Sequence, residues 1–578
     1  MNKRTLTGDV SHFSQGKFQQ SIRWILLSLV AILGLTVFHH FEYLSLGRKP
    51  KTELNTIKYS GEHINWEPCG DLKGDPLECS SINVPIDQFA QNPDPNPNQT
   101  FAIPLMRLRA AKATQNLLVN PGGPGASGID LLYRRGSQLR AIVGEGFHLL
   151  SFDPRGVNSS IPAASCYPDD ETRRRLSGSS ILNPLLEAST IYAWAKNFAQ
   201  ACSDTMGEYA SYINTPQTAA DMNSILNAVG QRDMIYWGFS YGSLLGQTYA
   251  GLFPERTQRV IIDGVVNQFK WYDGIYEIES QVNVEEVLDG FFEECLKTDN
   301  YSCPLFDLTV SKDPRVLSRI VRSYIDDLGP NPLNVYLNSS AYGILNFDHV
   351  WRNGVLPALY NPAGWSFLAD VLCLLIRGDA TRAFLAFGTN HPQRDESSKF
   401  VTLNDGLSGP DHWPQSSAGL IHWMLPYLLN SSLTPSDISL YFLKQQWKLP
   451  RTHSYVPRRG VETAHPLLIL STTYDAITPL VSAVSANEAF DRSQIIEVEG
   501  YGHSSLAVAS VCVVKHVRAF LYEGIMPSNY TKCEVDSPYF IRKNKNDKVP
   551  TRLHFQDPED QIIHDAQLEF VTGWEVIL

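Results

Sequence analysis

One serine in this chain has neighbours that suit a nucleophile. Ser240 is the centre of the pentad Gly238-Phe-Ser-Tyr-Gly242, which follows a short apolar run at 234–237 and precedes apolar residues at helical spacing as far as Pro254. A serine in a tight strand-to-helix turn is the nucleophile-elbow pattern, because the turn strains the serine backbone and flanking glycines let strand and helix approach closely. The pentad therefore predicts that Ser240 stands at the end of a sheet strand and attacks an acyl carbon.

A serine hydroxyl at its ordinary pKa is a weak nucleophile, so Ser240 needs a base and an acid that orients the base. In chains with a nucleophile elbow, the acid and the histidine follow the serine, each after a strand. Asp475 ends one apolar run, and His503, flanked by glycine, follows the next; among 15 histidines it is the only one in such a setting. We expect His503 to be the base and Asp475 the acid. Asp263 is the second choice for the acid, and Asp491 at a helix end fits less well.

The glycine-rich stretch Asn120-Pro-Gly-Gly-Pro-Gly-Ala-Ser-Gly128 follows the apolar run 117–119. Glycines let backbone N–H groups converge on one point, as an oxyanion requires. We expect the donors to be the N–H groups of Gly123 and Tyr241, the residue after the nucleophile. A phosphate loop is the rival interpretation, but the Gly-Lys-Ser/Thr ending is absent, and no Cys-x-x-Cys or His-Glu-x-x-His spacing indicates a metal. We therefore expect no metal and no cofactor.

The elements that would position these residues alternate between strand and helix. Alternation from residue 116 onward predicts an α/β fold, a mainly parallel sheet with helices on both faces, preceded by strands within 64–86 and 101–108. The alternation lapses into helical, aromatic-rich segments at 267–464, which we interpret as a helical cap inserted over the sheet; an independent domain is the alternative. The predicted parts are an N-terminal anchor and linker at 1–60, the core at 61–266 and 465–535, the cap at 267–464 and a tail at 536–578.

The N-terminus carries a membrane-targeting pattern. Basic residues precede an uncharged run from Trp24 to Phe38, which predicts a signal anchor at about 24–42 with the N-terminus cytoplasmic and the remainder lumenal or extracellular. A cleaved signal peptide and secretion are the alternative. The net charge of −12 offers no broad basic surface, so we do not expect nucleic-acid binding.

Two further patterns favour an oxidising compartment. Glycosylation triplets begin at six asparagines, and most of the nine cysteines fall in near-neighbour pairs, which predicts disulfides although the sequence alone does not prove their connectivity. The asparagines are Asn98, Asn158, Asn300, Asn338, Asn430 and Asn529, and the cysteine pairs are Cys69 with Cys79, Cys166 with Cys202, Cys295 with Cys303, and Cys512 with Cys533.

Taken together, the motifs resemble those of the tripeptidyl and prolyl aminopeptidase-like serine peptidases of the α/β-hydrolase fold. The resemblance covers about residues 64–533 and is weakest in the cap. It departs from the prolyl enzymes at Pro121, where they have histidine, and at Asn158, where glycine is common. The matching motifs are Asn120-Pro-Gly-Gly-Pro-Gly125, Phe152-Asp-Pro-Arg-Gly156, Gly238-Phe-Ser-Tyr-Gly242, Tyr249-Ala-Gly-Leu-Phe-Pro254, Ile262-Asp-Gly264, Asp475-Ala-Ile-Thr-Pro479, Gly502-His503 and the C-terminal run from Ser510 to Cys533.

The resemblance implies a serine hydrolase that works through an acyl-enzyme and releases residues or short peptides from free N-termini. It also implies that acidic cap residues hold the substrate ammonium. An esterase or lactonase acting on small metabolites uses the same machinery and is the alternative; a third possibility is an anchored binding protein without activity. Acidic residues near the start of the cap, none of which the sequence singles out, are Glu277, Glu279, Glu285, Glu286, Glu293 and Glu294.

Overall fold

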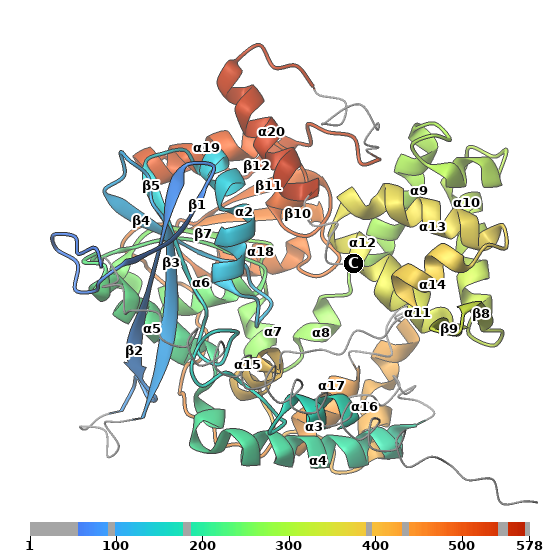
Figure 1. Cartoon of the computed structure of the whole chain (residues 1–578), viewed down its shortest axis with the longest axis horizontal. Helices are drawn as coiled ribbons and strands as arrows, with labels where there is room; N and C mark the ends of the chain where they lie inside the picture. The colour runs from blue at the N-terminus through green and yellow to red at the C-terminus, as the bar shows by residue number, and fades with distance from the viewer. Residues whose placement is uncertain are drawn as a thin grey trace, which may run out of the picture. The chain divides into compact units, whose positions relative to one another are not determined.

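A computed structural model of the protein describes residues 56–90, 99–176, 187–388, 396–430, 438–540 and 553–572 (Figure 1). The predicted membrane anchor lies outside these residues. Within them, no helix combines the length and the apolar character needed to cross a membrane.

The centre of the fold is a ten-stranded sheet. Strands β1, β2, β3 and β5 pair with one another in antiparallel fashion, and the strands that follow β5 in the sheet, up to β12, are parallel to it. Its order is β1-β2-β3-β5-β4-β6-β7-β10-β11-β12. The strands are β1 (Glu67–Leu72), β2 (Asp75–Pro85), β3 (Thr100–Leu108), β4 (Gln115–Asn120), β5 (Phe147–Phe152), β6 (Met234–Phe239), β7 (Thr257–Asp263), β10 (Leu468–Tyr474), β11 (Gln494–Tyr501) and β12 (Thr531–Glu534).

The apolar runs of the sequence become the central strands because helices cover both faces of the sheet. Every residue of β5 and β6 is buried, as expected for parallel strands inside an α/β fold. The region 64–86 is not one strand but contains the β1–β2 hairpin, which turns at Gly74. The φ of Gly74 is +96°, which a glycine adopts without strain.

Two apolar cores lie on opposite faces of this sheet. On one face, α2 (Gly128–Val143), α19 (Val511–Glu523) and α20 (Pro558–Thr572) pack against the strands; Figure 1 shows α20 beside α2 and α19. On the other face lie α5 (Thr215–Ala228), α6 (Tyr241–Leu252) and α18 (Leu480–Ala489). Helix α6, which begins directly after Ser240, is almost entirely buried, so the elbow is fixed from all sides.

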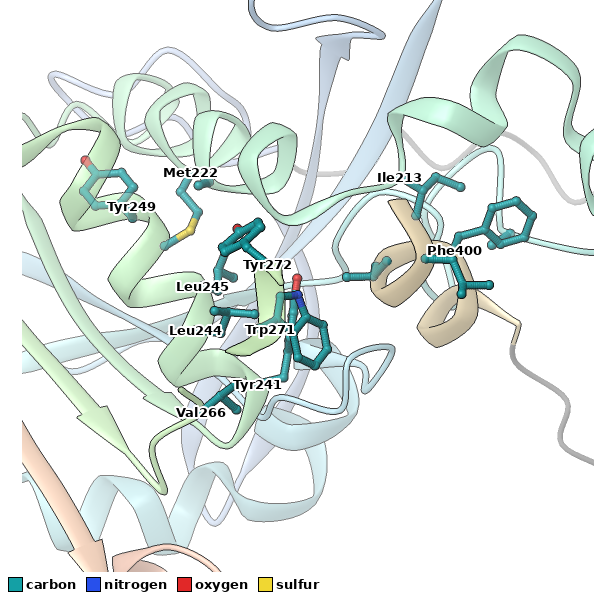
Figure 2. Packing of buried hydrophobic residues seen from close by; sticks show 14 of the residues in the cluster. Ile213, Met222, Tyr241, Leu244, Leu245, Tyr249, Val266, Trp271, Tyr272 and Phe400 are labelled. Carbon is teal, nitrogen blue, oxygen red and sulfur yellow. The ribbon is translucent and has the colours of Figure 1, made fainter. Parts of the chain in front are cut away.

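Figure 2 shows how the second core reaches beyond the sheet. Tyr241 and Leu244 of α6 pack near Trp271 of α7 (Gln268–Tyr272), and Phe400 of α15 (Ser397–Asp405) belongs to the same cluster. The rings of Tyr241 and Trp271 have centroids 5.8 Å apart. The residue after Ser240 is therefore held by side chains from well beyond the core strands.

The chain between β7 and β10 is largely helical, with one hairpin, β8 (Leu333–Asn338) and β9 (Ala341–Leu345). Figure 1 shows two groups in it, one of α9–α14 with the hairpin and one in which α16 and α17 pack on α4 (Ala188–Met206). The remaining helices are α3 (Asp170–Leu176), α8 (Tyr276–Glu279), α9 (Val284–Lys297), α10 (Pro314–Asp327), α11 (Phe347–Val350), α12 (Leu356–Tyr360), α13 (Trp365–Ile376), α14 (Thr381–Phe387), α16 (Ser417–Asn430) and α17 (Ile438–Gln446).

Disulfides join four cysteine pairs, in the connectivity that the sequence predicted, and Cys373 is a buried thiol in α13. The bonds are Cys69–Cys79, Cys166–Cys202, Cys295–Cys303 and Cys512–Cys533. Disulfides persist in oxidising compartments.

Candidate active site

Ser240 occupies a strained turn between β6 and α6. Its φ is 58° and its ψ is −125°, a conformation that costs a non-glycine residue roughly 1–3 kcal/mol and persists only where the surrounding structure enforces it. The Ser240 N–H donates to the Asp263 carbonyl at 2.8 Å, and Ser243 Oγ donates to the Ser240 carbonyl at 2.5 Å. Hydrogen bonds at both the N–H and the carbonyl of Ser240 therefore hold this strained conformation in place.

The neighbouring glycines are needed because other chain segments touch them. A β-carbon at Gly238 would lie 2.3 Å from the Gly242 carbonyl oxygen, and one at Gly242 would lie 2.7 Å from the Asn120 carbonyl oxygen. A β-carbon at Gly122 would lie 2.9 Å from Ser240 Cβ and 3.0 Å from the Tyr241 nitrogen. The glycine-rich loop after β4 is thus in direct contact with the elbow.

Asp475 and His503 form a hydrogen-bonded pair at the ends of β10 and β11. His503 Nδ1 lies 3.0 Å from Asp475 Oδ1 and 2.9 Å from Oδ2. The Asp475 carboxylate is fully buried and also accepts from Thr478 Oγ1 at 2.7 Å and from the Ser504 N–H at 3.0 Å. These donors fix the carboxylate and, through it, the histidine ring.

The electrostatics of the pair favour an ionised Asp475. Burial raises the pKa of Asp475, but the facing His503 and the Thr478 donors lower it by more, so the net direction is downward. Burial lowers the pKa of His503, but the Asp475 carboxylate raises it by more, so its net direction is upward.

Asp263, the second candidate for the acid, lies elsewhere in the hydrogen-bond network. Its buried carboxylate accepts from the Ser505 N–H at 2.7 Å, from Ser505 Oγ at 2.5 Å and from Trp237 Nε1 at 3.2 Å. Burial raises its pKa to about 6. Asp263 therefore anchors the loop after His503, whereas Asp475 touches the imidazole itself. Asp491 forms no hydrogen bond with Asp475 or His503 among the described residues; its backbone N–H donates to the Val461 carbonyl.

The loop after β4 offers backbone donors beside Ser240. The Gly122 N–H is used, because it donates to Asn120 Oδ1 at 2.9 Å. The N–H groups of Gly123 and Tyr241 bond to no other group among the described residues. The Tyr241 N–H is one of the unsatisfied donors in the first turn of α6, where the helix dipole also favours negative charge.

Ser240 and His503 line one cavity of about 100 Å³. His503 Nε2 is buried and has no hydrogen-bond partner among the described residues, so it can exchange a proton with a group in the cavity. The walls come from three parts of the chain that lie far apart in sequence: Pro121, Leu131, Phe239, Ser504, Leu506 and Ala507 from the core, Tyr360 and Asn361 from the segment before β10, and Phe570 and Val571 from α20.

The sequence predicted Ser240 and His503 at this site but not the other wall residues, and four of those come from outside the core: Tyr360, Asn361, Phe570 and Val571. The Tyr360 ring meets the His503 ring edge-on, with centroids 5.4 Å apart. The Tyr360 carbonyl accepts from the backbone N–H of His503 at 2.8 Å. Asn361 Nδ2 donates to the Val571 carbonyl at 3.4 Å. No short motif in the sequence marks these four positions. The apolar residues of α20 indicate a helix, but they do not show that this helix packs beside the cavity.

The side chain of Tyr241 is tied to the segment between β7 and β10. Its hydroxyl lies 2.6 Å from Thr215 Oγ1, which donates to Asp405 Oδ2 at 2.5 Å, and Trp271 Nε1 donates to the same oxygen at 2.8 Å. Figure 2 shows Tyr241 and Trp271 on adjacent helices. The residue that follows Ser240 is therefore held through both its ring and its hydroxyl.

The acidic residues near the start of this segment differ in their partners. Glu277 is paired with Lys444 Nζ at 2.7 Å, and Glu285 with Arg322. Glu279 accepts only from neutral donors among the described residues, Asn267 Nδ2 at 2.9 Å and Ser482 Oγ at 2.7 Å. Glu294 is paired with Lys297.

Four of the six predicted glycosylation asparagines have side chains among the described residues. Asn300, Asn338 and Asn529 are exposed. Asn158 is exposed but uses its amide, since Nδ2 donates to Asp153 Oδ2 at 2.9 Å from a backbone with φ of 44°. Asn98 and the Asn430 side chain lie outside the described residues.

The fold and this geometry define an α/β-hydrolase. A model of the alpha/beta hydrolase fold family matches residues 115–294, and a model described as TAP-like protein matches residues 442–533. The tripeptidyl aminopeptidase of Streptomyces lividans is 31% identical over 497 residues, which cover 81% of this chain and 86% of that protein. The chain belongs to this family, the tripeptidyl aminopeptidase-like serine peptidases of the α/β-hydrolase fold, as its motifs predicted.

Two other relatives widen the range of named activities. Serine protease Hip1 of Mycobacterium tuberculosis (strain ATCC 25618 / H37Rv) is 28% identical over 500 residues, covering 82% of this chain and 91% of its own. A protein of the same strain named Carboxylesterase B is 24% identical over 497 residues, covering 81% of this chain and 89% of its own.

Proposed function

We propose that Ser240, His503 and Asp475 form a catalytic triad that cleaves peptides through an acyl-enzyme. One observation carries the proposal: His503 is bonded to Asp475 through Nδ1, while its Nε2 is unpartnered beside the cavity that it shares with Ser240. This is the arrangement that a general base needs when a carboxylate fixes its tautomer.

In the proposed first step, Ser240 Oγ attacks the carbonyl carbon of the scissile amide and its proton passes to His503 Nε2. The N–H groups of Gly123 and Tyr241 stabilise the oxyanion. His503 then returns the proton to the leaving amine as the C–N bond breaks. Water attacks the acyl-enzyme, gives a proton to His503, and releases the acid while Ser240 regains its proton.

We propose an exopeptidase specificity, in which residues or short peptides are released from free N-termini. The named activity of the Streptomyces lividans relative supports this choice. Residues 267–464, which supply Tyr360 and Asn361 to the wall of the Ser240 cavity, would act as a cap.

Glu279 is our candidate for the group that binds the substrate ammonium. Its donors are neutral, so its negative charge is not cancelled by a cation among the described residues. It also contacts Ser482 in α18, the helix that begins five residues after Asp475. Glu277 and Glu285 lack this property, because each already faces a basic side chain.

Matched peptidyl amides with free and acetylated N-termini test this proposal. We expect the free substrates to be cleaved at least ten-fold faster in kcat/KM, and Glu279→Gln to abolish that preference by raising KM for free substrates only. Glu285→Gln is the control, because its partner Arg322 already neutralises the charge. Equal rates on free and acetylated substrates would contradict the exopeptidase assignment.

An esterase is the second candidate, supported by the relative named Carboxylesterase B. Simple p-nitrophenyl esters, assayed beside the peptides, distinguish the two. If esters are turned over at least a hundred-fold faster than every peptide, the esterase assignment replaces the peptidase assignment, while the triad stands.

We also propose that the catalytic part works outside the cytoplasm. The disulfides support an oxidising compartment, and the proposed anchor at about 24–42 would hold the protein in a membrane. The exposed Asn338 and Asn529 are suitable for glycosylation, whereas Asn300 would have to give up its bond to Asp307 and Asn158 its bond to Asp153.

A further inference from the structure

A second cavity, of about 820 Å³, lies along the flank of α5 and α6. It shares no lining residue with the cavity at Ser240. One wall is the segment 451–461, which leads from α17 toward β10. The other walls come from the chain after β2, from the start of α5 and from the end of α6. Their residues are Asp87, Phe89, Pro216, Gly251 and Leu252. Cavities of roughly 300–1,000 Å³ suit small-molecule ligands.

The cavity is positively charged in a protein whose net charge is −12. Arg451 and Arg458 both line it, and neither forms an ion pair with another described residue. Arg451 donates only to groups without full charge, the Asp405 carbonyl at 3.1 Å and His453 Nε2 at 3.3 Å. The wall also contains one acidic residue, Asp87, whose carboxylate accepts from Gln217 Nε2 at 2.7 Å and from the Phe89 N–H at 2.9 Å. These neutral donors do not cancel its charge, so the two arginines and Asp87 together give the wall one net positive charge.

His453 belongs to the same wall and has a buried ring nitrogen without a partner among the described residues. Its side chain lines the cavity and the residue is only 9% exposed, yet Nδ1 has no hydrogen-bond partner among the described residues. A buried polar group without a partner costs free energy until something satisfies it. Because Nδ1 itself is buried, an anion in the cavity reaches it only if the His453 ring turns.

The remaining wall is mixed, with Thr452, Ser454 and Tyr455 beside apolar side chains. Leu252, Val456 and Val461 line the cavity, and Val456 is 67% exposed. An inorganic ion would leave these side chains without a contact, whereas an organic anion would cover them.

We propose that this cavity binds a small organic anion, whose carboxylate or phosphate group pairs with Arg451 and Arg458, and whose apolar part packs on Leu252, Val456 and Val461. The planar guanidinium is suited to both anions, since it can present two parallel N–H donors. The site is separate from the proposed peptidase site and does not depend on it.

Calorimetric titration of the full-length protein tests the proposal, after a fluorophosphonate has blocked Ser240 so that the active site cannot take the probe. The probes share one hydrocarbon body: 4-phenylbutyrate, 3-phenylpropyl phosphate and the neutral 4-phenylbutyramide. We expect at least one anion to bind at least ten-fold more tightly than the amide, and the stronger of the two anions identifies the preferred group. Equal binding by the amide, or no binding by either anion, overturns the proposal.

Arginine variants locate the site. We expect Arg451→Gln and Arg458→Gln each to weaken anion binding at least five-fold, and Arg459→Gln to change it less than two-fold. Arg459 is the matched control because it neighbours Arg458 in sequence but does not line the cavity and pairs with Glu488. Unchanged binding in Arg458→Gln overturns the proposal.

Arg451→Gln needs one more measurement, because Arg451 donates to the carbonyl of Asp405, whose side chain supports Tyr241 through Thr215. The rate of fluorophosphonate labelling at Ser240 reports damage to the elbow. Arg458 makes no hydrogen bond to another described residue, so Arg458→Gln decides the question even if Arg451→Gln labels slowly.

Discussion

His503 is the residue at which burial and a neighbouring charge act in opposite directions. Burial alone would keep its imidazole neutral, but the Asp475 carboxylate at 2.9 Å stabilises the charged ring, and the net direction of the pKa is upward from its ordinary value of about 6.5. The base of the proposed mechanism works only when neutral, so protonation removes activity. We predict that kcat/KM falls on the acid side with an apparent pKa above about 6.5, measured on a free peptidyl amide.

Asp475→Asn separates the two influences on His503. The amide cannot stabilise the imidazolium, so the pKa of His503 should fall and the acid limb of the profile should move to lower pH. We also predict a loss of roughly 10⁴-fold in plateau kcat/KM, because the wrong tautomer is favoured. If Asp263→Asn, and not Asp475→Asn, moves the acid limb in this way, the acid has been assigned to the wrong carboxylate.

At the scale of elements, the contact between the loop after β4 and the β6–α6 turn sets the geometry of the site. Gly122→Ala would place a methyl group 2.3 Å from the Phe239 carbonyl oxygen. We predict at least a hundred-fold loss of kcat, because oxyanion donors must be placed within a few tenths of an ångström. Fluorophosphonate labelling of Ser240 measures the effect without a peptide substrate.

Gly74→Ala is the control for backbone strain. Gly74 has the same φ of +96° as Gly122, but a β-carbon there would meet no atom within 4 Å. We expect it to cost about 1 kcal/mol of stability, measured by denaturant unfolding, with activity unchanged. A comparable loss of activity in both variants would mean that strain, and not the contact with Ser240, explains the need for Gly122.

The sequence predicted the residues that sit at strand ends, because strand position and chemistry coincide there. Ser240, Asp475 and His503 each follow an apolar run, and parallel strands bring their carboxyl ends to one edge of the sheet. The contact between Thr215 and Asp405 was not predicted, because the two residues are 190 positions apart and no sequence motif links them. The two antiparallel strands β8 and β9 were also missed within a segment that otherwise reads as helical.

At the scale of the whole molecule, the Ser240 cavity depends on α20 as well as on the core. Phe570 lines it and is 4% exposed. We predict that Phe570→Ala widens the cavity and raises kcat/KM for substrates with bulky residues before the scissile bond at least ten-fold relative to small ones, in a panel of peptidyl amides. The truncation should also cost about 3–5 kcal/mol of stability.

Ile563→Ala is the matched control, because Ile563 is buried in the same helix but does not line the cavity. It should cost about 2–5 kcal/mol without changing selectivity. Identical selectivity in the two variants would show that α20 stabilises the fold without shaping the substrate site.

The position of α20 in the chain has a consequence for biosynthesis. A ribosome makes Ser240, Asp475 and His503 before it makes residues 558–572, so a growing chain can bring the proposed triad together while the wall formed by Phe570 and Val571 is still missing. In that nascent chain the serine is reached without the part of the wall that α20 provides. The wall of the cavity is therefore completed only when α20 docks onto α2.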